Sequence, residues 1–185
     1  MGVIGEVGLF ETLNELTGER FRISKTPPSH TKANKVLFLV IGTVDRIKMS
    51  FLERGLAWLK AGAKVITTCS DLADPSSKGS DFVLGMPNHI LHLLKYSVQV
   101  GRPYSLGKPH PIFAQTICRH FDELKSQDIL FVGDTIHTDI QLAEEHDFTS
   151  CLVLTGNTKA DTLDNYTLTP SIIKDSVKDL VDLVG

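Results

Sequence analysis

Hydrophobic and polar positions follow two different periods along the chain. Short apolar runs bounded by polar or turn residues predict strands buried on both faces, at Lys35–Ile41, Lys64–Thr68, Asp128–Val132 and Ser150–Leu154. Longer segments with apolar residues three or four positions apart predict helices, at Phe51–Ala61, Pro87–Ser97, Pro111–Phe121, Thr138–His146 and Ser171–Leu183. Strand–helix alternation at this spacing predicts an α/β fold with a largely parallel sheet.

The last predicted helix rests on periodicity and on a capping residue. Apolar side chains recur at three and four positions from Ile172 to Val184, and Ser171 can cap a helix after Pro170. Two polar, turn-rich stretches, Ser24–Asn34 and Asp71–Ser80, predict surface loops.

Composition adds few constraints. The 185 residues suffice for one sizeable domain or two small ones, and 42% apolar with 22% charged residues is ordinary for a soluble globular protein. A formal charge of −3 with scattered Lys and Arg argues against a nucleic-acid partner and a membrane surface. The longest apolar stretch, Val36–Ile41, is too short to span a bilayer, and the opening Met1-Gly2-Val3 lacks a basic n-region and a cleavage site, so we expect no signal peptide. Three widely spaced cysteines without a CxxC pair indicate reduced thiols, so we expect a cytoplasmic protein.

Two acids follow a predicted strand within LFVGDTIHTDI, residues 130–140. Gly133 permits a sharp turn, and Asp134 then stands at the carboxyl end of a strand, where parallel sheets form their ligand crevice. Asp139 falls in the first turn of the next helix, where a carboxylate suits the positive helix end and can orient a neighbour or a metal-bound water. Either acid alone is explained as a turn former or a helix-start acid, but the two together favour a cation site.

A lysine lies one helix upstream, in SLGKPHPIF at 105–113. A short apolar segment ends in Gly107, Lys108 follows, and Pro111 fits the first turn of a helix. A lysine in such a loop is a point charge that suits a phosphate, although a surface lysine in a turn is the plainer interpretation of the motif by itself. A lysine at one strand end and an acid at the next favour the functional interpretation.

These stretches resemble a known family. SLGKPHPIF, ILFVGDTIHTDIQLAEE and TSCLVLTGNT resemble the third and fourth motifs of the haloacid dehalogenase (HAD) superfamily, in its branch of p-nitrophenylphosphatases and phosphoglycolate phosphatases. Three earlier stretches resemble, in order, parts of the large cap domain of that branch: GVIGEVGLFETL, VIGTVDRIKMSFLERGLAWLKAGAKVITTCSD and LGMPNHILHLLKYSVQVGRPYSLGKP. The resemblance implies an α/β cap-like domain at 1–103 and the C-terminal half of a Rossmann-like hydrolase core at 104–185.

The resemblance also implies a chemistry, the Mg²⁺-dependent hydrolysis of small phosphate monoesters. It implies that Asp134 binds magnesium, that Asp139 supports this metal site, and that Lys108 neutralises the phosphoryl group. Thr68 and Asp71, which bound the loop Thr68-Cys69-Ser70-Asp71, would face the substrate.

Two residues depart from the family pattern. Cys69 stands where Asn is usual, which puts the substrate preference in doubt. Thr135 follows Asp134 where Arg or Asn is common, which bears on the geometry of the metal site.

The family's nucleophile is missing from the 185 residues. These phosphatases attack phosphorus with an aspartate of a DxDG motif, and neither this motif nor the family's phosphate-binding Ser or Thr occurs here. The passage VLFLVIGTVD at 36–45 resembles either that strand with both acids replaced, by Leu39 and Ile41, or the cap strand before a GxDR turn. The cap order of the residues that follow favours the second interpretation. Under both, we predict that the chain alone is inactive.

Two hypotheses follow for the function. In the first, the chain represents a truncated magnesium-dependent phosphatase, which acts on a small phosphorylated metabolite when complete. In the second, it is a non-catalytic homologue that binds a phosphorylated ligand or a protein. The resemblance implies that the nucleophile strand lies beside Ile129–Val132, and without it this strand would be an exposed apolar edge. We therefore expect a chain that is marginally stable, that forms a homo-oligomer through the cap or this edge, or that is part of something longer.

Overall fold

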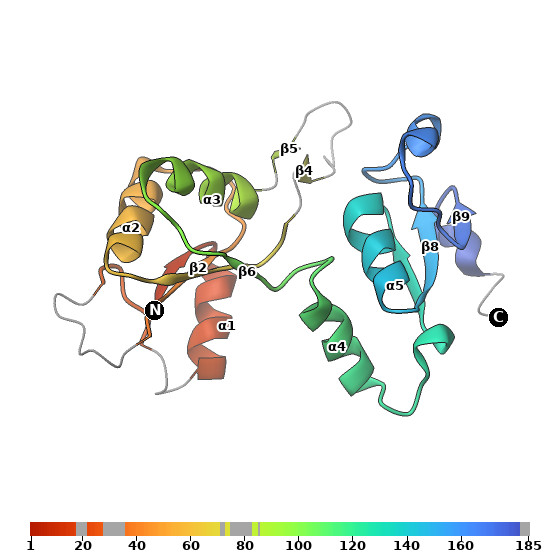
Figure 1. Cartoon of the computed structure of the whole chain (residues 1–185), viewed down its shortest axis with the longest axis horizontal. Helices are drawn as coiled ribbons and strands as arrows, with labels where there is room; N and C mark the ends of the chain where they lie inside the picture. The colour runs from red at the N-terminus through yellow and green to blue at the C-terminus, as the bar shows by residue number, and fades with distance from the viewer. Residues whose placement is uncertain (18–21, 28–35, 71–72, 75–82, 85, 182–185) are drawn as a thin grey trace. The chain divides into compact units, whose positions relative to one another are not determined.

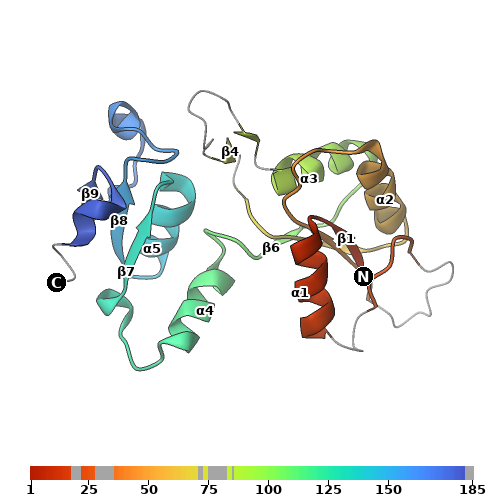
Figure 2. The same ribbon diagram turned by 180° about the vertical axis from the view of Figure 1, so that it is seen from behind.

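The computed structural model of the chain describes residues 1–17, 22–27, 36–70, 73–74, 83–84 and 86–181. Close approaches between Cα atoms divide the chain into two compact units. Unit 1 comprises Met1–Leu72 and Leu84–Leu106, and unit 2 comprises Ala73–Val83 and Gly107–Gly185 (Figures 1 and 2). The assignment of residues 1–103 to a cap and of 104–185 to a hydrolase core stays a prediction.

Unit 1 is built on a four-stranded parallel sheet in the order β1-β2-β3-β6. Its strands are β1 (Gly2–Ile4), β2 (Phe38–Ile41), β3 (Lys64–Thr67) and β6 (Tyr104–Ser105). β2 is buried on both faces, because Leu39, Val40 and Ile41 are each at most 5% exposed. β2 pairs in parallel with β1 and β3, and the interpretation of the passage 36–45 as a cap strand stays a prediction.

The described residues of unit 1 form the helices α1 (Val7–Thr17), α2 (Met49–Lys60) and α3 (Met86–Ser97). α2 packs on α3, and both helices also contact the sheet. Gly55 permits the close approach of α2 and α3, because a Cβ at this position would lie 2.9 Å from Leu94 Cδ1. Trp58, the only tryptophan of the chain, is 1% exposed within the same core.

Unit 2 is built on a three-stranded parallel sheet in the order β7-β8-β9. Its strands are β7 (Leu130–Gly133), β8 (Thr149–Val153) and β9 (Ile172–Lys174). Its α-helices are α4 (Pro111–His120) and α5 (Gln141–Glu145), and a π-helical turn (Ile136–Ile140) precedes α5. Short 3₁₀ turns cover Ser126–Asp128, Ala160–Asn165 and Val177–Leu180. A separate two-stranded pairing joins β4 (Ala73–Asp74) to β5 (Val83–Leu84).

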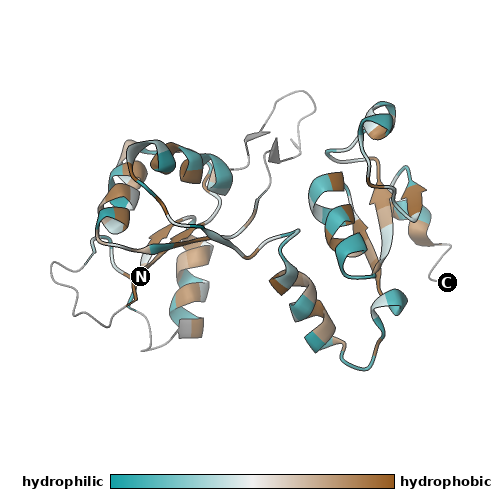
Figure 3. Cartoon of the chain, viewed as in Figure 1, coloured by the Kyte–Doolittle hydropathy of each residue, from teal (hydrophilic) through white to brown (hydrophobic). Residues whose placement is uncertain are grey.

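β7 is an edge strand of unit 2. Among the described residues no strand pairs with its outer side, and Leu130 and Val132 are 38% and 36% exposed. Figure 3 shows hydrophobic residues along the strands of this unit, as a parallel sheet normally requires for burial on both faces. An apolar edge strand is a template for pairing with another strand. The expected homo-oligomer stays a prediction, and the outer side of β7 is one surface through which it could form.

The predicted α/β class with parallel sheets is confirmed. The four predicted strands and four of the five predicted helices are present, with bounds shifted by a few residues. Most of the two predicted loops, Ser24–Asn34 and Asp71–Ser80, lies outside the described residues. Among the described residues, no helix combines the length and the apolar character needed to cross a membrane.

The predicted helix Ser171–Leu183 is wrong. Ile172–Lys174 form strand β9, which pairs in parallel with β8, and a 3₁₀ turn at Val177–Leu180 follows within the described part of the range. The Ser171 hydroxyl, expected to cap a helix, lies 3.2 Å from the hydroxyl of Ser150 on β8. Two consecutive β-branched residues fit a pleated strand well, and the available edge of β8 outweighs the helical periodicity.

Leu94 tests the packing of unit 1. Leu94→Ala should lower the free energy of unfolding by about 2–5 kcal/mol, because the side chain is 1% exposed and its loss leaves a cavity. The measurement is urea unfolding followed by the fluorescence of Trp58. Leu93→Ala is the matched control, since Leu93 is 47% exposed and its truncation should cost at most about 0.5 kcal/mol. Equal losses from both variants would contradict the described packing of α3.

Candidate functional site

The two acids after β7 are placed by a wide turn. Asp134 follows the strand directly, and residues 136–140 then form a π-helical turn in which the Thr135 carbonyl accepts the N–H groups of Asp139 and Ile140. The predicted helix Thr138–His146 therefore begins earlier, and Asp139 lies in this turn. π-Helical turns occur frequently at functional sites because the extra residue redirects a side chain.

The Asp139 side chain is 2% exposed and accepts three hydrogen bonds. Its Oδ1 atom accepts from Lys108 Nζ at 2.5 Å, and its Oδ2 atom accepts the backbone N–H groups of Asp134 at 3.0 Å and Thr135 at 3.1 Å. Gly133 is necessary here, because a Cβ at this position would overlap the Asp139 side chain. A carboxylate removed from water needs such partners, so Asp139 joins the loop after β7 to Lys108.

Lys108 lies in the loop that enters α4. His110 caps this helix by accepting the N–H of Ile112 on Nδ1 at 3.3 Å, and Pro111 stands in the first turn, as the sequence predicts. The Lys108 side chain is 34% exposed, so its ammonium group reaches both Asp139 and the surface. The structure thus brings together Lys108, Asp134 and Asp139, three of the five predicted site residues.

The Asp134 carboxylate is held by the loop after β8. The backbone N–H of Asn157 donates to Asp134 Oδ2 at 2.9 Å, and the N–H of Thr158 donates to the Asp134 carbonyl at 2.9 Å. Gly156 makes this approach possible, since a Cβ there would overlap the carboxylate. The β7–β8 register, in which Gly133 pairs with Leu152, aligns the carboxyl ends of the two strands.

Sequence reasoning missed Asn157 and Thr158 at this site and noted Thr135 only as a departure from the family pattern. The Thr135 hydroxyl donates to Asp134 Oδ1 at 3.3 Å, and the side-chain amide of Asn157 donates to Thr135 Oγ1 at 2.9 Å. The hydroxyl of Thr158, a residue only 2% exposed, accepts the N–H of Ile136 at 3.2 Å. The signal was the polar TGNT that follows a buried strand, at the same sheet edge as Asp134.

The donor set fits a hard cation at Asp134 better than at Asp139. Mg²⁺ is usually bound through one or two carboxylates, with waters and substrate phosphates completing its octahedron. Asp134 is partly exposed and each of its carboxylate oxygens accepts one hydrogen bond, whereas the Asp139 side chain is 2% exposed and its carboxylate accepts three. Within the described part of the chain, no three His, Cys, Asp or Glu side chains gather as a closed metal cage.

The two predicted substrate-facing residues are not tested by this geometry. Thr68 belongs to unit 1, where it follows β3 and donates its N–H to the Ile41 carbonyl at 3.1 Å. Asp71 lies outside the described residues. A role of either residue in binding a substrate therefore stays a prediction.

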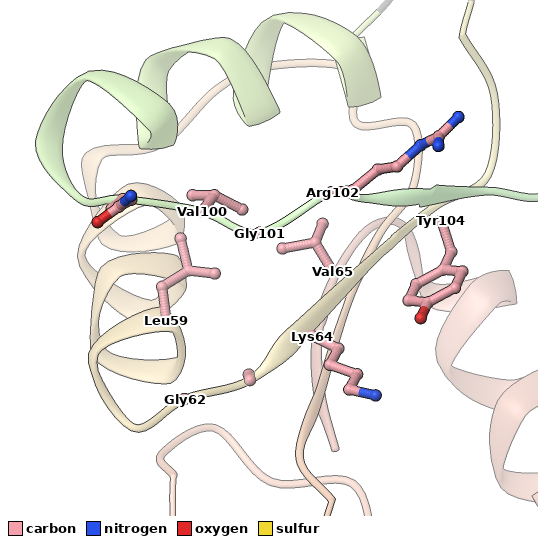
Figure 4. Close-up of a pocket in the computed structure, with 10 residues that line it drawn as sticks. Leu59, Gly62, Lys64, Val65, Val100, Gly101, Arg102 and Tyr104 are labelled. Atoms are coloured by element: carbon pink, nitrogen blue, oxygen red, sulfur yellow. The ribbon is translucent and has the colours of Figure 1, made fainter.

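Unit 1 contains a cavity of about 410 Å³ between the end of α2, the start of β3 and the segment entering β6 (Figure 4). Lys64 and Arg102 line it, but Figure 4 shows their charged ends pointing apart, so they do not converge on one anion. None of the predicted site residues lines this cavity.

Cys69, Cys118 and Cys151, which all lie among the described residues, are not joined in disulfides. Cys151 is fully buried in β8, and this burial raises the pKa of its thiol. A raised pKa lowers the fraction of reactive thiolate, so Cys151 has the properties of a packing residue.

Comparisons with known proteins bear on the same residues. The family described as HAD-hydrolase-like matches residues 105–180, which include every residue of the unit 2 site. The chain is 28% identical over 182 residues to the sugar-phosphatase AraL of Bacillus subtilis, covering 98% of this chain and 61% of that protein. It is 24% identical over 178 residues to the ribonucleotide monophosphatase NagD of Escherichia coli, covering 96% of this chain and 64% of that protein.

The chain is also similar to a phosphatase of known structure. The p-nitrophenyl phosphatase of Archaeoglobus fulgidus aligns with a TM-score of 0.75 at 26% identity, covering 98% of this chain and 66% of that chain. The chain thus spans between three fifths and two thirds of the length of these proteins, since the shares are 61%, 64% and 66%.

Gly156 tests the geometry around Asp134. Gly156→Ala should lower the free energy of unfolding by about 1–3 kcal/mol, because the added methyl group collides with the Asp134 carboxylate. Urea unfolding followed by circular dichroism measures this loss. Gly101→Ala is the control, because a Cβ there meets no atom within 4 Å. A Gly156→Ala protein as stable as the control would show that the loops after β7 and β8 are not interlocked as described.

Proposed function

Because the chain belongs to the haloacid dehalogenase superfamily, in the branch of NagD and the p-nitrophenyl phosphatases, we propose that it holds the cation and the phosphate of a magnesium-dependent phosphatase. The substrate class is small phosphate monoesters. One observation carries the proposal: Lys108 and the backbone of Asp134 are both bound to the buried carboxylate of Asp139. A cationic and an anionic group are thereby held at one edge of a parallel sheet.

Each residue has a distinct role in this proposal. Asp134 is the protein ligand of Mg²⁺, which would neutralise the charge of the phosphoryl oxygens when bound. Lys108 supplies a point charge to the phosphoryl group. Asp139 contacts neither the cation nor the phosphate in this proposal. It acts through their binding residues, because it orients the Lys108 ammonium and fixes the peptide N–H groups of Asp134 and Thr135. Such positioning accounts for much of what a protein contributes to phosphoryl transfer.

The relatives support the proposed substrate class. Their names describe a sugar-phosphatase, a dihydroxyacetone phosphatase and a ribonucleotide monophosphatase. A phosphate monoester on a small metabolite is what these substrates share, and Asp134 and Lys108 suit that common part. Thr68 and Asp71 remain the proposed contacts to the variable part of the substrate. We also propose that the protein is cytoplasmic.

The absence of a DxDG nucleophile limits the chemistry that these 185 residues can carry out. They contain no DxDG segment, the motif whose aspartate attacks phosphorus in the family that the sequence resembles. We therefore expect binding of Mg²⁺ and phosphate without appreciable turnover.

A non-catalytic role of these 185 residues, which contain no DxDG segment, is the second candidate. In that case the same site binds a phosphorylated ligand, or the chain binds a protein, and no nucleophile is required. The two candidates agree on Asp134 and Lys108 if the ligand is phosphorylated. They differ in whether an added DxDG-bearing segment would restore hydrolysis.

Thermal unfolding with Mg²⁺ and inorganic phosphate tests the site. A ligand at a hundred times its Kd stabilises the folded state by about 2.7 kcal/mol, so the melting temperature of the chain should rise with both ligands present. Asp134→Asn should abolish the rise caused by Mg²⁺, and Lys108→Met should abolish the further rise caused by phosphate. Lys178→Met, at an exposed position of the same unit, is the matched control and should behave as the unaltered chain.

Control measurements separate a loss of ligand binding from a loss of folding. Lys108→Met leaves the buried Asp139 without its cation, so the melting temperature without ligand and the charge-conserving Lys108→Arg variant serve as references. With p-nitrophenyl phosphate and Mg²⁺, the chain should release no more nitrophenolate than its Asp134→Asn variant. Turnover that depends on Asp134 would contradict the predicted inactivity, and an unchanged phosphate effect in Lys108→Met would contradict the role of Lys108.

A further inference from the structure

Asp134 is held at both oxygens of its carboxylate. Oδ2 accepts the backbone N–H of Asn157 at 2.9 Å, and Oδ1 accepts the hydroxyl of Thr135 at 3.3 Å. Each carboxylate oxygen can accept about two hydrogen bonds or metal contacts. The two donors therefore fix the plane of the carboxylate, and acceptor capacity remains for a cation.

The hydroxyl of Thr135 has a defined direction. The side-chain amide of Asn157 donates to Thr135 Oγ1 at 2.9 Å. An amide N–H can only donate and a carboxylate can only accept, so the Thr135 hydroxyl accepts from Asn157 and donates to Asp134. The three side chains form a one-directional relay from amide to hydroxyl to carboxylate.

This relay connects two separate loops. Thr135 follows β7, and Asn157 lies 22 residues later, in the loop after β8. The backbone N–H of Thr135 also donates to Asp139 Oδ2 at 3.1 Å, so one residue contacts both acids. Thr135 is one of the two positions at which the sequence departs from the family pattern, so its role has to be derived from its own contacts.

We propose that Thr135 and Asn157 are positioning residues for the cation at Asp134, which they hold in its binding orientation before the cation arrives. The inference rests on the proposed function, which makes Asp134 the cation ligand. A carboxylate that is already fixed loses little rotational freedom on binding. Without the relay, the Asp134 side chain keeps the single backbone donor of Asn157 and can rotate, so the cation should bind more weakly.

Isothermal titration of the full 185-residue chain with Mg²⁺ tests the inference. Thr135→Val keeps the shape of the side chain and removes the hydroxyl, and it should weaken Mg²⁺ binding about tenfold, as loss of a hydrogen bond to a metal ligand typically does. Thr135→Ser keeps the hydroxyl and should bind within about threefold of the unaltered chain. Thr116→Val is the control, because the Thr116 hydroxyl donates to the Ile112 carbonyl within α4 and should leave Mg²⁺ binding unchanged.

The relay also predicts a coupling between its two members. Asn157→Ala removes the amide but keeps the backbone N–H, so it should weaken Mg²⁺ binding less than Thr135→Val. The double variant Thr135→Val with Asn157→Ala should bind no more weakly than Thr135→Val, because both changes act through the same hydroxyl. The rescue by Ser and this lack of additivity are results that a merely structural role would not produce.

The outcomes distinguish the inference from the function on which it rests. Tight Mg²⁺ binding by Thr135→Val, together with loss in Asp134→Asn, would overturn the positioning role and leave the proposed metal site intact. Additive losses in the double variant would overturn the relay. Mg²⁺ binding that Asp134→Asn does not change, or no binding by the unaltered chain, would overturn the proposed metal site and the inference with it. If Thr135→Val does not fold, Thr135→Ser and Asn157→Ala decide by the same criteria.

Discussion

The candidate site depends on the burial of one carboxylate. Asp139 is 2% exposed, and an acid in that position requires donors to replace water. Its three donors come from the two segments that the site needs, namely Lys108 before α4 and the peptide N–H groups of Asp134 and Thr135 after β7. Satisfying a buried charge therefore also assembles the groups proposed to bind a phosphate and a cation.

Two close approaches allow this arrangement. Gly133 leaves room for the Asp139 side chain, and Gly156 leaves room for the Asp134 carboxylate, so the loops after β7 and β8 interlock. The parallel register of these strands brings both loops to the same sheet edge, where chains of this architecture bind ligands. The π-helical turn at 136–140 completes the geometry, because it places the Asp139 carboxylate within hydrogen-bonding distance of the N–H groups of Asp134 and Thr135.

Periodicity located most elements of the fold but not their pairing. The strands that became β2, β3, β7 and β8 were predictable, because a short apolar run between turn residues has few other solutions. Ser171–Leu183 shows the limit. Ile172 and Ile173 fit a helical period as well as a strand, and only the open edge of β8 selects the strand. The exposed outer side of β7 follows from the strand order, and the sequence predicted it only through a resemblance.

The sequence by itself determined which charged residues stand at the ends of strands and helices. Lys108, Asp134 and Asp139 could be identified because strands, turns and helix starts are encoded within a few residues. Only the tertiary structure decided how the surroundings of these residues differ, with three hydrogen bonds to the buried Asp139 carboxylate and with Asp134 partly exposed. It also decided that Asn157 contacts Thr135 across 22 residues, because hydrogen bonds over such separations depend on strand register and on space left by glycine.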